Sequence, residues 1–328
     1  MLTRLTGGGG CLIPAVLAVV TWPVVALAQA PWPTKPITFI VTYPPGGGAD
    51  LMARLVAPKM SEILGQPIVV DNKPGAAGQI GAGFVAKSKP DGYTVMVDAA
   101  SFAINPSLYP KLPYDPVKAF TPIGMLAVYP HVIVVTPSFK AKSVAELIAM
   151  AKAAPGTISY ASSGSGSAQH LAGAVFVERA KVDMVHVPYK GGGPAMIDVM
   201  GGHVPVFFAN VASSLSHIKS GKLRALAVMG DRRIPALPDT PTLAELGIAN
   251  AEVYEWNGMF VPAGTPAPIV AKLADALKKA LESPEVKEKV ASVGGELFAG
   301  GPAEAAKFID EQRQRLGKVV RDGNIRPD

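Results

Sequence analysis

Runs of glycine and serine follow several apolar segments of the chain. The stretch YPPGGGAD (residues 43–50) follows the apolar run 37–42, and SSGSGS (162–167) follows a second short apolar run. Three more small-residue stretches follow apolar runs in the same way: DAAS (98–101), PYKGGGP (188–194) and ANVASS (209–214). Glycine lets a ligand come close to the backbone, and serine adds a hydroxyl donor. These residue types are suited to binding an anion through backbone N–H groups.

The location of these stretches favours the same chemistry. Each lies at the carboxyl end of a predicted strand and the amino end of a predicted helix, and in open parallel sheets those ends line the ligand crevice. The first N–H groups of a helix lack intrahelical partners and carry partial positive charge, so they attract anions. Capping and turn formation explain one such loop alone. Five of them at one edge of the sheets exceed what capping requires.

Signatures of catalysis are missing from these loops. Gly46–Gly48 lacks the lysine and the serine or threonine of a P-loop, and its surroundings do not fit GxGxxG. Ser162–Ser167 never satisfies GxSxG. The histidines are isolated, with none at the i, i+4 spacing of a helical zinc site, and Asp50 and Asp98 are the only carboxylates in the loops. The sequence predicts a binding protein without catalytic residues, metal or cofactor.

The elements that must position the loops alternate along the chain. Strand patterns occupy residues 37–43, 67–70, 94–97, 132–136, 159–161, 182–187, 204–208, 225–229 and 258–261. Helical patterns lie at residues 50–64, 143–153, 167–180 and 194–200, and two amphipathic helices follow at 268–282 and 302–320. Strand–helix–strand order predicts an α/β fold with mainly parallel sheets flanked by helices.

The first thirty residues have the pattern of an export signal. Arg4 is the only charge before an apolar run, 11–27, which ends in small residues of the AxA type. The alternative is a membrane anchor, but Pro14 and Pro23 interrupt the run and no charged stop follows it. We predict that residues 1–28 are a signal peptide cleaved after Ala28, with Ala30 as the second possible site.

Composition narrows the class of protein. The 328 residues, 49% of them hydrophobic, are enough for two domains. The net charge of +6 permits acidic ligands, but the basic residues are scattered, which does not support nucleic-acid binding. Cys11 is the only cysteine and lies in the predicted signal peptide, so the mature chain would have no disulfide and no thiol chemistry.

Several stretches together resemble the Bug family, the periplasmic substrate-binding proteins of tripartite tricarboxylate transporters. They include YPPGGGAD, YASSGSGSAQHLAG, HVPYKGGGPAMIDVMGGHV, LPDTPTLAELG and WNGMFVPAGTP, in the family's order. The resemblance implies a two-lobed periplasmic binding protein of type II, the Venus flytrap arrangement. Lobe 1 would comprise residues 29–130 and 252–328, and lobe 2 residues 131–251.

The resemblance also implies the partners. The protein would be a periplasmic monomer that captures a small organic anion and transiently contacts the membrane components of a tripartite transporter. The ligand would be a di- or tricarboxylate, an acidic amino acid or an aromatic acid. Two alternatives stay open: a ligand-sensing receptor for a signalling partner such as a sensor kinase, and an exported hydrolase or lyase of organic acids.

In this family, backbone N–H groups and ordered waters from loops of both lobes hold the ligand carboxylate. By position, these are the glycine loop (residues 43–48) and the serine loop (residues 162–167). The predicted binding residues are Tyr43, Pro44, Gly46, Gly47, Gly48, Asp50, Asp98, Ser101, Phe102, Ser162, Ser163, Gly164, Ser165, Gly166, Ser167, His170, Tyr189, Lys190 and Asn210.

Several of these residues have two interpretations. Lys190 would meet a second carboxylate or would be a solvated loop lysine, and His170 would contact the ligand or be a hydrogen-bonded structural residue. Tyr43 and Phe102 would cover an aromatic ring or only wall the crevice. Outside the predicted set, Trp256 would belong to the hinge or the core, and we assign the glycine-rich segment 71–83 to packing of lobe 1.

Replacement of Gly47 by valine is predicted to abolish carboxylate binding without unfolding the protein. The branched side chain would fill the space in which the ligand meets the backbone. Isothermal titration calorimetry with an acid that binds the wild-type protein measures the effect, and a circular-dichroism melt controls for folding. An unchanged dissociation constant would remove the glycine loop from the site.

Overall fold

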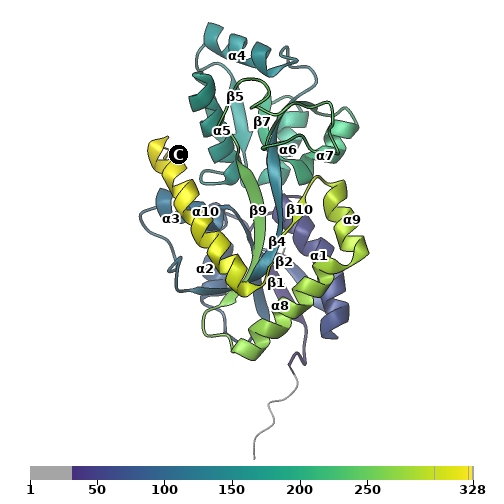
Figure 1. Cartoon of the computed structure of the whole chain (residues 1–328). Coiled ribbons are helices and arrows are strands. Elements are labelled where there is room, and N and C mark those ends of the chain that lie inside the picture. Colours follow the sequence, from purple (N-terminus) through teal and green to yellow (C-terminus); the bar gives the residue numbers. More distant parts are fainter. Residues whose placement is uncertain (1–31, 299, 324, 327–328) are drawn as a thin grey trace, which may run out of the picture. The chain divides into compact units, whose positions relative to one another are not determined.

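In the computed structural model, which describes residues 32–298, 300–323 and 325–326, the strands form one mixed sheet with helices packed on it (Figure 1). The strands are β1 (Ile37–Val41), β2 (Ile68–Asn72), β3 (Thr94–Ala99), β4 (Phe120–Val135), β5 (Ser159–Ser162), β6 (Val185–Pro188), β7 (Val206–Asn210), β8 (Arg224–Met229), β9 (Tyr254–Pro262) and β10 (Glu296–Leu297). The helices are α1 (Gly48–Leu64), α2 (Gln79–Ala86), α3 (Ser101–Leu108), α4 (Val144–Ala153), α5 (Ala168–Ala180), α6 (Gly192–Met200), α7 (Val211–Lys219), α8 (Ala267–Glu282), α9 (Pro284–Ser292) and α10 (Pro302–Asp322).

Parallel pairing builds two sections of this sheet. β1 lies between β2 and β3, and β5 lies between β6 and β7, with every pair parallel. The strands in these sections run toward glycine- or serine-containing loops, so the loops gather at their carboxyl ends. The predicted α/β fold class is confirmed. The antiparallel strands β4 and β9 make the sheet mixed.

β4 belongs to both sections of the sheet. Its first part, as far as Pro130, pairs with β9, and its last part, from His131 onward, pairs with β7 and β8. Figure 1 shows β4 and β9 running side by side from the level of α8 toward β5 and β7. The partners of β4 therefore change at the residue where the sequence predicts the crossing between lobes. The division into two lobes itself stays a prediction.

The sequence predicted only the end of β4, because Pro122 and Pro130 argue against a long strand. The structure places one proline beside a break in the pairing with β9 and the other at its end. The register with β9 shifts between Pro122 and Gly124, so Pro122 lies at an irregularity. Pro130 is the last residue paired with β9, directly before the partners change.

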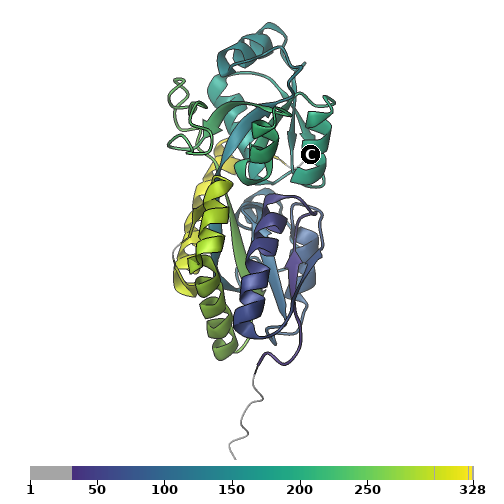
Figure 2. The ribbon, with the colours of Figure 1, turned by 90° about the vertical axis from the view of Figure 1, so that its right-hand side faces the viewer.

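Two hydrophobic clusters of the described residues pack against the sheet. One surrounds Phe176 and Phe208 beneath α4 and α5, and the other surrounds Phe102 and Phe260 beneath α3 and α10. Trp256 is fully buried in the second cluster, which places it in the core. Figure 2 shows α8 and α9 stacked along the same side of the molecule as α1, consistent with the contacts between α1 and both helices. The amphipathic C-terminal helices predicted from sequence are thus present, with α9 as an addition.

The predicted signal peptide, with Ala28 and Ala30, falls in residues 1–31, outside the described part of the chain. Among the helices that the structure describes, none combines the length and the apolar character needed to cross a membrane.

Candidate ligand-binding site

Loops at the carboxyl ends of the parallel strands surround two adjoining cavities. The first has a volume of about 240 Å³ and is lined by Tyr43, residues 75–78, Tyr109, residues 163–165 and residues 188–190. The second has a volume of about 20 Å³ and is lined by Tyr43, residues 47–49, Ala99, Ser163, Gln169, Gly192, Asn210, Ser213 and Glu255. Because Tyr43 and Ser163 line both, we treat the two cavities as one candidate site.

The structure brings part of the predicted binding set to these cavities. The residues that line them are Tyr43, Gly47, Gly48, Ser163, Gly164, Ser165, Tyr189, Lys190 and Asn210. The residues that line neither cavity are Pro44, Gly46, Asp50, Asp98, Ser101, Phe102, Ser162, Gly166, Ser167 and His170. Direct contact with a ligand stays a prediction for the whole set.

Four helices begin at the smaller cavity. They start at Gly48 (α1), Ala168 (α5), Gly192 (α6) and Val211 (α7), and each contributes a lining residue from its first turn. The N–H groups of a first turn have no partner within the helix, and the aligned peptide dipoles place partial positive charge there. Four such ends around one cavity create an attractive potential for an anion without a charged side chain.

Hydrogen bonds from behind hold the glycine loop in place. The buried Asp50 carboxylate accepts the Gly46 N–H at 3.0 Å and Arg54 Nε at 2.9 Å. Asn72 Nδ2 donates to Asp50 Oδ1 and to the Tyr43 carbonyl oxygen, both at 2.9 Å. Burial alone would raise the pKa of Asp50, but these hydrogen bonds outweigh it and lower the pKa. Asp50 is therefore an ionised support for the loop.

The side chains of the serine loop are largely used to hold the loop itself. Ser162 Oγ accepts the Gly164 N–H at 3.1 Å and lies 2.6 Å from His186 Nε2. Ser167 Oγ caps α5 by accepting the His170 N–H at 3.2 Å. His170 Nδ1 in turn accepts a backbone N–H of the loop, and its ring stacks on His186 at 4.0 Å. These contacts fit the second interpretation of His170, that of a hydrogen-bonded structural residue.

Glycine is required where facing loops touch. A β-carbon on Gly191, whose φ is +141°, would lie 2.2 Å from Pro44 Cγ, and one on Gly48 would lie 2.7 Å from Asn210 Nδ2. The sequence predicted close approach of a ligand at these loops, but at Gly48 and Gly191 the adjacent space belongs to protein atoms. At Gly192, in contrast, no atom lies within 4 Å of the β-carbon position.

Asp98 and Phe102 lie behind the cavities. Asp98 is fully buried and its Oδ1 accepts Thr42 Oγ1 at 2.6 Å and the Ala99 N–H at 2.8 Å. Burial raises the pKa of Asp98 to about 6. Phe102 packs on Phe260, with the ring centroids 4.5 Å apart, and belongs to the core. The sequence allows two roles for Phe102, to cover an aromatic ring of the ligand or to wall the crevice. Its position in the core fits the second.

Lys190 is the only cation in the two linings. It is exposed, and no carboxylate of the described residues lies within ion-pair distance of it. The neighbouring Tyr189 hydroxyl donates to Asp198 Oδ2 at 2.7 Å, which anchors this loop. In the described part of the chain, no group of three or more His, Cys, Asp or Glu residues could hold a metal ion.

Sequence reasoning missed several residues that line the cavities, among them Tyr109, Gln169, residues 75–78 and Glu255. Residues 75–78 line the larger cavity, although we assigned their segment to packing; positive φ angles at Ala76 (48°) and Ala77 (49°) show a strained backbone there. Glu255, the second residue of β9, lines the smaller cavity. No motif surrounds Glu255, and it reaches the site only through the pairing of β9 with β3 and β4.

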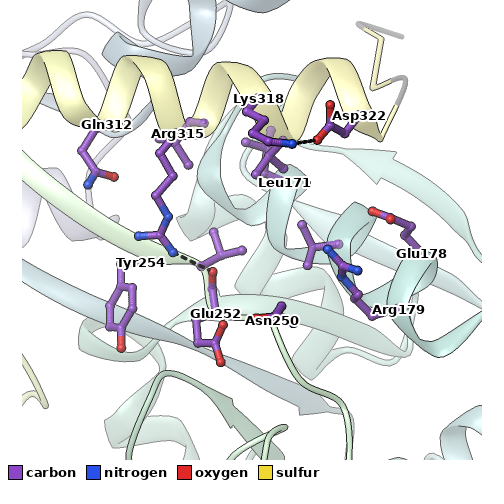
Figure 3. A pocket seen from close by; sticks show the side chains of 14 residues that line it. Leu171, Glu178, Arg179, Asn250, Glu252, Tyr254, Gln312, Arg315, Lys318 and Asp322 are labelled. Atoms are coloured by element: carbon purple, nitrogen blue, oxygen red, sulfur yellow. Dashed lines mark hydrogen bonds and ion pairs between the residues drawn. The ribbon is translucent and has the colours of Figure 1, made fainter.

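A further cavity of about 390 Å³ lies between α5, α10 and the segment before β9 (Figure 3). Its charged side chains are balanced in sign: Glu178, Glu252 and Asp322 against Arg179, Arg315 and Lys318. Lys318 is paired with Asp322, and Arg315 donates to the Glu252 carbonyl oxygen at 3.3 Å. None of the predicted binding residues lines this cavity, and its balanced charge gives no preference for an anion.

Comparison with known proteins identifies the family. The family described as "Tripartite tricarboxylate transporter family receptor" matches residues 52–325 of the chain. BugT of Bordetella pertussis is 39% identical over 293 residues, which cover 89% of this chain and 90% of BugT. The resemblance to the Bug family seen in the sequence is confirmed.

Solved structures of similar sequence share the fold. The periplasmic binding protein BugD is 35% identical, with a TM-score of 0.87 over 90% of this chain and 100% of that one. Rpa4515 of R. palustris, solved with adipate, is 34% identical, with a TM-score of 0.88 and the same coverage. MatC of Rhodopseudomonas palustris, solved with bound malate, is 32% identical, with a TM-score of 0.84 over 88% and 100% of the chains.

Gly192→Val is expected to weaken carboxylate binding at least tenfold, because the added side chain projects into open space at the cavity. Calorimetric titration measures the affinity, and the melting temperature is expected to stay within about 4 °C of wild type, since a β-branched residue in a helix costs little. Ala267→Val, at the exposed start of α8, is the matched control and is expected to bind as wild type. Undiminished affinity of Gly192→Val would contradict the cavity assignment.

Proposed function

The chain belongs to the tripartite tricarboxylate transporter receptor family, and we propose that it captures a small organic carboxylate in the periplasm and delivers it to the membrane components of such a transporter. Proteins of this family are solute-binding proteins. The carboxylate, the compartment and the membrane partner are the parts that we propose for this chain.

The convergence of helix N-termini carries the proposal. Four helices start at the smaller cavity, and the first-turn N–H groups that no side chain caps present fixed donors of the kind that carboxylate oxygens accept. The adjoining space of about 240 Å³ leaves room for a small organic acid. An anion enters this arrangement without needing a buried lysine or arginine, whose own desolvation would be costly.

Two relatives support a ligand with two carboxylates. Rpa4515 was solved with adipate and MatC with bound malate, and both ligands are dicarboxylates. In this chain, the helix N-termini would hold one carboxylate, and Lys190 at the rim of the larger cavity would meet the second. The free ammonium of Lys190 is available for that pairing because none of the described carboxylates occupies it.

Capture follows from loops that face one another. A ligand that bridges the glycine loop and the serine loop makes its full set of contacts only while those loops stay close. Ligand binding would therefore favour the closed arrangement through contacts that the open one lacks. A transporter that recognises the closed arrangement of the loops would bind the ligand-bound protein and not the ligand-free protein.

A thermal-shift screen of small carboxylic acids, each paired with its neutral amide, tests this function. A ligand at 100 times its dissociation constant adds about 2.7 kcal/mol of stability, which corresponds to a rise of roughly 5 °C or more. At least one acid is expected to produce this rise, and its amide is expected to produce none. Equal shifts with acid and amide, or no shift with any acid, would contradict carboxylate capture.

A further inference from the structure

We propose that Glu255 selects ligands that carry a hydrogen-bond donor, a hydroxyl or an ammonium group, next to the carboxylate held by the helix N-termini. The inference rests on the proposed capture of a carboxylate and narrows the class of acid. An acidic side chain is unexpected at a site for anions, so its presence points to a second recognition element.

The hydrogen bonds of Glu255 with other described residues use only one of its two carboxylate oxygens. The residue is 95% buried, and its Oε1 accepts the backbone N–H groups of Ala100 at 2.9 Å and Trp256 at 3.1 Å. No donor among the described residues reaches Oε2, although the side chain lines the smaller cavity. A carboxylate oxygen in so enclosed a position is stabilised by a donor, and a molecule in the cavity, water or ligand, is able to supply one.

The other side chains around the cavity present donors. Asn210 Oδ1 accepts the Ala212 N–H at 2.7 Å, so its Nδ2 is the group that lies toward the glycine loop at Gly48. Gln169 Oε1 accepts Ser163 Oγ at 2.6 Å, which leaves its Nε2 to donate. Glu255 is the only acidic side chain in the two linings.

A ligand with both a carboxylate and a donor matches this pattern. Its carboxylate oxygens accept from the helix N-termini and the amide groups, and its hydroxyl or ammonium donates to Oε2. An unsubstituted acid that displaces water from the cavity leaves Oε2 without a partner. A site built to hydrogen-bond a ligand group discriminates strongly against the analogue that lacks it.

The charge of Glu255 adds a pH dependence. The pKa of Glu255 is raised to about 7. Burial is the largest cause of this raised pKa, the hydrogen bonds from the Ala100 and Trp256 N–H groups oppose it, and the charge of Asp98 on β3 adds to it. Tyr43 and Tyr129, the other titratable groups facing it, have pKa values raised by burial and stay neutral below pH 9. Above pH 7, ionised Glu255 accepts a hydrogen bond from a hydroxyl or ammonium group more strongly than the protonated side chain does. The preference for donor-bearing acids is therefore expected to grow from pH 6 to pH 8.

Calorimetric titration with matched acids tests the inference. Succinate, malate and aspartate share four carbons and carry hydrogen, hydroxyl or ammonium at C2; adipate and its 2-hydroxy and 2-amino derivatives repeat the series on a longer skeleton. On the tighter-binding skeleton at pH 8, wild-type protein is expected to bind a substituted acid at least tenfold more tightly than the unsubstituted one. Whichever substituted acid binds more tightly shows whether the site prefers a hydroxyl or an ammonium donor.

Glu255→Gln isolates the role of the carboxylate. The glutamine keeps Oε1 for the bonds from Ala100 and Trp256 but presents an amide N–H₂ group in place of Oε2. The preference is expected to fall below about threefold and to lose its dependence on pH. Glu252→Gln, three residues earlier and outside both linings, removes the same charge and is expected to keep the wild-type preference.

Distinct outcomes separate this inference from the proposed function. Wild-type protein that binds the unsubstituted acid as tightly as the substituted ones would overturn the role of Glu255 and leave carboxylate capture standing. A wild-type preference retained by Glu255→Gln would also overturn it. If Glu255→Gln does not fold, the wild-type protein still tests the inference. The ratio of its affinities for the substituted and unsubstituted acids is then compared between pH 6 and pH 8. Failure of every acid to bind would overturn both proposals.

Discussion

In the proposed site, the interaction on which the rest depends is attraction of an anion by the first turns of α1, α5, α6 and α7, through the backbone N–H groups that no side chain caps. Helix dipoles attract an anion only when the helix ends are held in place, and most polar side chains near the cavity serve that purpose. Ser167 and Asn210 cap their helices, and Asp50 holds the glycine loop. These side chains fix the backbone, and in the proposed site the backbone would meet the ligand.

Glycine residues also allow the loops to approach one another closely. Gly48 and Gly191 let segments from the two parallel sections of the sheet come into contact with Asn210 and Pro44. β4 and β9 tie those sections together, because the partners of β4 change at His131. In the proposed site, the glycines would therefore serve two purposes. Open positions such as Gly192 would give a ligand access to N–H groups, and Gly48 and Gly191 let protein segments touch.

The sequence predicted the features that depend on local residue order. Strand–helix alternation predicted the α/β fold class, and small residues after strands predicted most of the loops that gather at the cavities. It did not predict the length of β4, because Pro122 and Pro130 argue locally against a strand and only the partner strands accommodate them. Glu255 was missed for a related reason, since strand pairing brings it beside Ala99 and Ala100 from 155 residues away.

A crystal structure of the protein with the tightest-binding acid from the screen tests the central claim most directly. We predict carboxylate oxygens within about 3.2 Å of backbone N–H groups in the first turns of α1 and of at least one of α5, α6 and α7. A carboxylate held mainly by side-chain cations, or a ligand bound in the cavity between α5 and α10, would contradict the account.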